Sequence, residues 1–96
     1  MESAASIDTA KMMSTINDPN LEKVYFNGFT NALGAGDIII TLYLNGTPTK
    51  VLNLSYTVAK TLCQKLSETV DQLEKQSGIS ILTTDDVAKA LSPTPH

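Results

Sequence analysis

A strongly apolar run from Asp37 to Leu44 limits the possible folds most, because it is rich in β-branched residues and typical of a β-strand. Asn45-Gly46 follows it directly, and this dipeptide favours a tight hairpin because both residues tolerate a positive φ. Residues Thr47 to Leu54 are then expected to return as the antiparallel partner. The chain is therefore predicted to contain an antiparallel sheet.

Two loop lengths would give this hairpin different registers. A two-residue loop over 45–46 mixes apolar and polar residues on both faces, with the pairs Ile38–Asn53, Ile40–Val51 and Leu42–Thr49. A three-residue loop over 44–46 gives the pairs Ile38–Leu52, Ile40–Lys50 and Leu42–Pro48. We prefer the three-residue loop, with Gly46 left-handed, because it produces a mainly apolar face. The second face then carries Ile39, Thr41, Tyr43, Thr47, Thr49 and Val51.

A long amphipathic helix is predicted between Ser55 and Gly78. Ser55 can accept hydrogen bonds from the first free amides as an N-cap, and Gly78 is a natural C-terminal stop. Apolar residues recur at spacings of three and four between these ends and define one stripe, which is expected to pack on the sheet. The stripe consists of Ala59, Leu62, Cys63, Leu66, Val70 and Leu73.

The remaining elements are shorter. A strand is predicted over Val24–Thr30, interrupted at Asn27-Gly28, and a connection over 31–36. Ile79–Leu82 is predicted as a short strand, and the capping pattern Thr83-Thr84-Asp85-Asp86 opens a short helix. The predicted fold class is α+β, with an antiparallel sheet of three to four strands packed on one long helix and a short C-terminal helix.

The predicted organisation is a single α+β domain over 21–91, a flexible N-terminal arm over 1–20 and a flexible tail over 92–96. The arm ends at the turn sequence Asn17–Asn20. It is expected to be frayed, or to form a short helix when a partner receives Met12, Met13 and Ile16.

Composition narrows the classes of partner. The formal net charge is -3, and all seven basic residues are lysines. A chain without arginine and acidic overall is a poor match to nucleic acid or to an anionic membrane, so neither is expected as a partner. The single cysteine and the absence of a signal-like N-terminus favour the cytoplasm. A chain of this length buries a modest core, so oligomerisation is expected.

No group of residues indicates catalysis, a metal or a cofactor, so the protein is expected not to be an enzyme. His96 lies at the end of a proline-rich tail, and Cys63 lies on the apolar stripe as a small hydrophobe. Asp85-Asp86 is explained by helix capping. Gly34–Asp37 precedes a strand, whereas a phosphate-binding loop leads into a helix.

The aromatic residues all fall between positions 25 and 56. Tyr25 and Phe29 are expected to share one strand face, where neighbouring amides could read the edges of a planar ligand. The candidate ligand-binding residues are Tyr25, Asn27, Phe29, Asn31, Tyr43 and Asn53.

The run from Gly36-Asp37-Ile38 to Leu54-Ser55, with Ala59-Lys60 and Leu62 on the helix, resembles a family of small uncharacterised bacterial proteins. The resemblance covers about residues 24–75. It implies a β-meander followed by and packed on one amphipathic helix, in a dimer, and it implies no catalytic residue.

Two functions are consistent with these observations. The first is a non-catalytic, homo-oligomeric interaction or assembly module of bacterial or phage origin. Its interface is predicted on the second sheet face, at Ile39, Thr41, Tyr43, Thr49 and Val51. The alternative is a protein that binds or sequesters a small molecule, for example a nucleotide, at a subunit interface.

Overall fold

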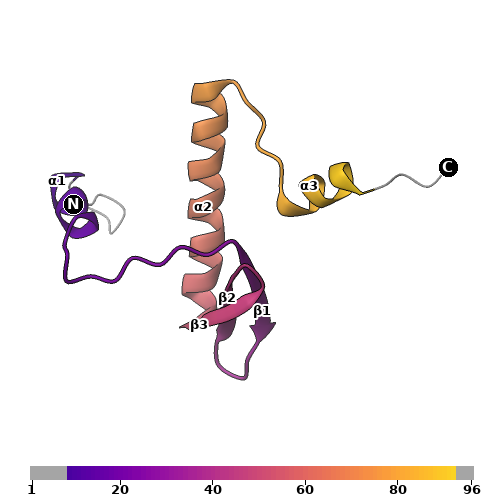
Figure 1. Ribbon diagram of the computed structural model, residues 1–96. Helices are drawn as coiled ribbons and strands as arrows, with labels where there is room; N and C mark the ends of the chain where they lie inside the picture. The colour runs from indigo at the N-terminus through magenta and orange to yellow at the C-terminus, as the bar shows by residue number, and fades with distance from the viewer. Residues whose placement is uncertain (1–8, 93–96) are drawn as a thin grey trace. The chain divides into compact units, whose positions relative to one another are not determined.

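The computed structural model describes residues 9–92 and has three helices and three strands within them (Figure 1). In chain order they are α1 (Thr9–Ile16), β1 (Gly28–Leu33), β2 (Ile38–Leu44), β3 (Thr47–Leu54), α2 (Tyr56–Ser77) and α3 (Thr84–Leu91). The strands form one antiparallel sheet in the order β1-β2-β3. The predicted α+β class, with a small antiparallel sheet, one long helix and a short C-terminal helix, is confirmed.

The β2–β3 hairpin has a two-residue loop, so the preferred three-residue register is wrong. β2 ends at Leu44 and β3 begins at Thr47, and both turn residues have positive φ, 52° at Asn45 and 85° at Gly46. Such a turn matches the twist of the flanking strands. The polar residue that this register places opposite Leu42 has a partner, because the Thr49 hydroxyl donates to the Leu42 carbonyl at 3.2 Å.

The observed register divides the residues predicted to form one interface. Thr49 and Val51 lie opposite Leu42 and Ile40, on the sheet face of those residues. Alternation along β2 places Ile39, Thr41 and Tyr43 on the other face. The single face of threonines and β-branched residues therefore does not form.

Strand β1 begins at Gly28 and continues to Leu33, four residues later at its start than predicted and three later at its end. The segment before it is held by Asn27, whose backbone N–H donates to the Tyr43 carbonyl at 3.1 Å. At the other end, the Gly34 N–H donates to the Asp37 carbonyl at 2.8 Å and closes the β1–β2 connection. The Asn27–Tyr43 contact joins residues distant in sequence, so local β-propensity did not locate the start of β1.

Both predicted helix starts are confirmed. The Ser55 hydroxyl accepts from the Val58 N–H, and α2 ends at left-handed Gly78. Thr83 and Asp86 form a reciprocal capping box at α3. The short strand predicted over Ile79–Leu82 is absent; the Ile81 N–H instead donates to the Glu74 carboxylate at 2.7 Å. A carboxylate at the helix end therefore takes a backbone donor that a sheet would have used.

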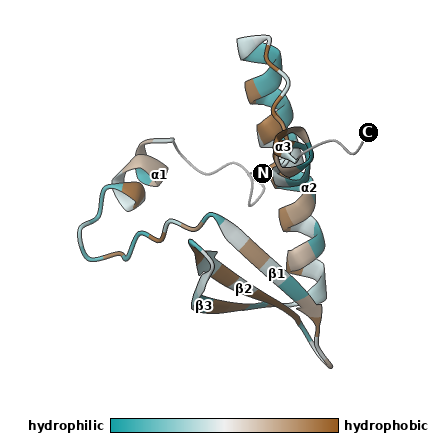
Figure 2. Ribbon diagram, turned by 45° about the vertical axis from the view of Figure 1, so that its right-hand side comes forward, coloured by the Kyte–Doolittle hydropathy of each residue, from teal (hydrophilic) through white to brown (hydrophobic). Residues whose placement is uncertain are grey.

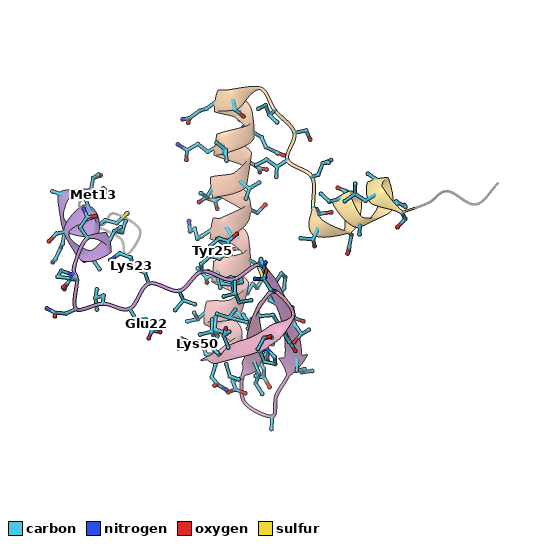
Figure 3. All side chains as sticks on the ribbon, in the orientation of Figure 1. Met13, Glu22, Lys23, Tyr25 and Lys50 are labelled. Carbon is cyan, nitrogen blue, oxygen red and sulfur yellow. The ribbon has the colours of Figure 1, made fainter. Side chains whose placement is uncertain are left out.

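The chain divides into two compact units. The first combines Met1–Thr30 with Ile40–Leu52, and the second combines Asn31–Ile39 with Asn53–His96. In the first, Leu42 is the one buried hydrophobic residue within 9–92, with 3% of its surface exposed, and Lys50 pairs with Glu22 at 3.0 Å (Figure 3). Helix α1 lies within the predicted arm and carries Met12, Met13 and Ile16, all exposed.

We expect Gly46→Val to lower the free energy of unfolding by about 1–3 kcal/mol, because a β-branched residue is excluded from the left-handed region. Nothing lies within 4 Å of a Cβ at this position, so the cost is purely conformational. Gly36→Val is the matched control, because Gly36 also has open space and lacks the positive φ. Urea unfolding measures both, and equal losses would contradict the turn assignment.

Candidate functional site

The apolar stripe of α2 lies largely open to solvent. Helix α2 has no buried residue, and Leu66, Val70 and Leu73 are 55%, 43% and 54% exposed. Figure 2 shows hydrophobic bands recurring along the helix. We call Ala59, Leu62, Cys63, Leu66, Val70 and Leu73 the α2 stripe. The prediction that the whole stripe packs on the sheet is therefore wrong.

The start of α2 contacts the connection between β1 and β2. The Tyr56 hydroxyl donates to the Gly34 carbonyl at 2.6 Å and ties the start of the helix to the β1–β2 connection. Beside this contact lies an open groove of about 450 Å³. Its lining is mostly apolar and comes from Asn31, Ala32, Leu33, Ile38, Tyr56, Ala59, Lys60 and Cys63. The groove thus continues the N-terminal half of the α2 stripe onto the end of the sheet.

Helix α2 is longer than any strand of the sheet. At 22 residues it is about 33 Å long, whereas strands of six to eight residues span about 20–27 Å. The hairpin and the capping signals allow these lengths to be compared in the sequence. The greater length of α2 is the feature of the sequence that the prediction of packing along the whole stripe did not use.

Two of the amides assigned to ligand binding already have structural partners. Asn27 donates through Nδ2 to Asn45 Oδ1 at 2.8 Å and accepts a hydrogen bond from the Asn45 N–H at 2.9 Å. These two bonds hold the residue before β1 against the hairpin turn. Asn53 donates to the Asp37 carboxylate at 2.9 Å. Both side chains thus take part in holding the fold.

The aromatic candidates do not share the predicted strand face. Tyr25 precedes β1, outside any strand, and is 76% exposed, whereas Phe29 is in β1 and also exposed. The Tyr43 hydroxyl lies 3.5 Å from that of Thr30. Tyr25, Asn27, Phe29 and Tyr43 belong to the first unit, and Asn31 and Asn53 to the second. Of the predicted set, only Asn31 lines the groove.

The structure places most of the residues that the sequence offers as candidates for catalysis or metal binding. Cys63 lies on the stripe as predicted, and it is exposed rather than buried. The Asp86 carboxylate accepts from the Thr83 N–H. Within residues 9–92, no three side chains of His, Cys, Asp or Glu gather as a metal site would require. His96 lies outside the described residues.

The candidate functional site is therefore the α2 stripe together with the groove, since this is the largest set of exposed apolar side chains on one element. None of the helices within 9–92 has the length and apolar character needed to cross a membrane. Comparison with known proteins finds no family model, no curated protein and no solved structure that matches this chain.

Proposed function

We propose that the protein is a non-catalytic interaction module of bacterial or phage origin that assembles with copies of itself in the cytoplasm. The observation that carries the proposal is the exposed α2 stripe. Contiguous exposed apolar surface on a soluble chain marks an interaction site, because leaving it in water forgoes about 25 cal/mol per Å². An oligomer would bury this surface without any change in the fold.

The described side chains favour binding over catalysis. Cys63, the one thiol, lies among apolar residues and has no histidine within the described part of the chain to act as its base. The carboxylates nearest to each other in sequence, Asp85 and Asp86, occupy the first turn of α3, where they favour the helix N-terminus. The placement of these groups thus supports binding rather than catalysis.

The alternative, a small-molecule site at a subunit interface, is supported by the groove and by Asn31 on its wall. It is weakened by the other amides, since Asn27 and Asn53 are engaged within the fold. A thermal-shift screen of nucleotides and metabolites tests this alternative. A ligand that raises Tm further as its concentration increases above Kd would favour it, because binding to the native state must stabilise that state.

Sedimentation equilibrium tests the proposed function directly. We expect a species of at least twice the 10.3 kDa chain mass at tens of micromolar, dissociating on dilution. A monomer throughout that range would overturn the proposal.

A further inference from the structure

The α2 stripe without Leu62, and extended by Ser77, forms a repeat that a second copy of the same helix fits. Starting from Ala59, apolar or small residues recur at alternating spacings of four and three, at Ala59, Cys63, Leu66, Val70, Leu73 and Ser77. This is the heptad seam through which two helices interlock side chains, with Cys63, Val70 and Ser77 in a positions and Ala59, Leu66 and Leu73 in d positions. A seam of about three heptads is short, so it needs support from outside the helix.

The charges of α2 indicate the direction of the second helix. Its N-terminal half carries Lys60 and Lys65 and no carboxylate, whereas its C-terminal half carries Glu68, Asp71 and Glu74 against Lys75. Two parallel helices would bring the acidic halves together. Two antiparallel helices instead place each basic half beside an acidic half, which is favourable at both ends of the pair.

The antiparallel register also follows from the seam. In antiparallel pairs, a positions face d positions, so Leu66 meets the partner's Val70 and Cys63 meets the partner's Leu73. Lys60 and Glu74 both follow d positions and lie on the same flank of the seam. The two-fold axis therefore brings Lys60 of each copy beside the partner's Glu74. Two Lys60–Glu74 ion pairs therefore form per dimer.

The groove receives the C-terminal half of the partner in this arrangement. Ala59 and Cys63 line the groove together with Leu33 and Ile38 of the sheet. Because the partner's Leu73 lies opposite Cys63, its side chain enters this apolar space. Leu33, 80% exposed in the single chain, becomes covered. The sheet end thus supplies the support that three heptads lack.

We propose that two copies of the chain associate through antiparallel α2 helices, with the end of each stripe seated in the groove of the other copy. This inference rests on the proposed self-assembly and specifies its surface and direction. The occupant of the groove is accordingly a second copy of this chain.

Disulfide trapping tests the direction. In a Leu73→Cys variant, the introduced thiol faces the partner's Cys63, and mild oxidation should give a covalent dimer with two 63–73 bridges, mapped by mass spectrometry. Within one helix these positions are about 15 Å apart, too far for an internal bridge. The unmodified chain, with Cys63 alone, is the control and should remain largely uncrosslinked.

Charge reversal tests the register independently. Lys60→Glu should raise the dimer Kd about tenfold, because two attractive pairs become repulsive. Adding Glu74→Lys to that variant should restore most of the affinity relative to either single change. The double variant is compared with Glu74→Lys alone. Both variants lack the Glu74 bond to the Ile81 N–H, so the effect of losing that bond cancels.

The outcomes separate the two proposals. A monomer in sedimentation overturns both. A dimer that crosslinks through Cys63 to Cys63 in the unmodified chain is parallel, and it overturns the antiparallel inference while leaving self-assembly intact. A dimer that forms neither the 63–63 nor the 63–73 bridge associates through another surface. That result also overturns the antiparallel inference and leaves self-assembly intact. A dimer with 63–73 bridges and restored affinity in the double charge variant supports both.

Discussion

In the proposed dimer, Leu66→Glu is expected to cause dissociation into monomers, raising Kd at least about a hundredfold. The side chain lies at the centre of the α2 stripe, and each dimer contains it twice. Placing two carboxylates in an apolar interface leaves them without partners, at a cost of about 3 kcal/mol or more in association free energy. Sedimentation equilibrium of the variant and the unmodified chain measures the change.

The single chain should tolerate this substitution, because Leu66 is 55% exposed before association. The circular dichroism spectrum is therefore expected to keep its helical signal. Gln64→Glu is the matched control: it adds the same charge to the same helix, about 200° around the axis from Leu66, and should leave Kd unchanged. An equal loss of dimer in both variants would mean that net charge, and not the stripe, governs association.

Leu42→Ala is expected to lower the free energy of unfolding by about 2–5 kcal/mol. Leu42 is 3% exposed on the central strand, and truncation leaves a cavity that the flanking strands β1 and β3 cannot fill without moving. A domain of this size has a stability of roughly 5–10 kcal/mol, so the loss is a large share of the total. Urea unfolding followed by circular dichroism at fixed protein concentration gives the value.

Leu44→Ala provides the comparison for Leu42. It deletes the same atoms two residues along the same strand, where the side chain is 39% exposed. We expect a loss below about half of that at Leu42, because less apolar surface returns to water. Similar losses at the two positions would show that Leu42 is not more deeply buried than Leu44.

Sequence alone determined the elements whose signals lie within a few residues of one another. Ser55 caps the Val58 amide, Gly78 ends α2, and Thr83 and Asp86 cap each other. Asn45-Gly46 marked the hairpin for the same reason, since both residues adopt the positive φ that the turn requires. Such interactions are made by neighbours in the chain and do not depend on the rest of the fold.

The tertiary structure decided where β1 begins and how exposed the α2 stripe is. Asn27 and Asn45 are separated by 18 residues, and Tyr56 and Gly34 by 22, yet these pairs hold the start of β1 and the start of α2. The amide of Asn27 was predicted to serve a ligand because its partner was invisible locally. Periodicity showed that α2 has an apolar side, and only the structure showed that the side chains on it are largely exposed.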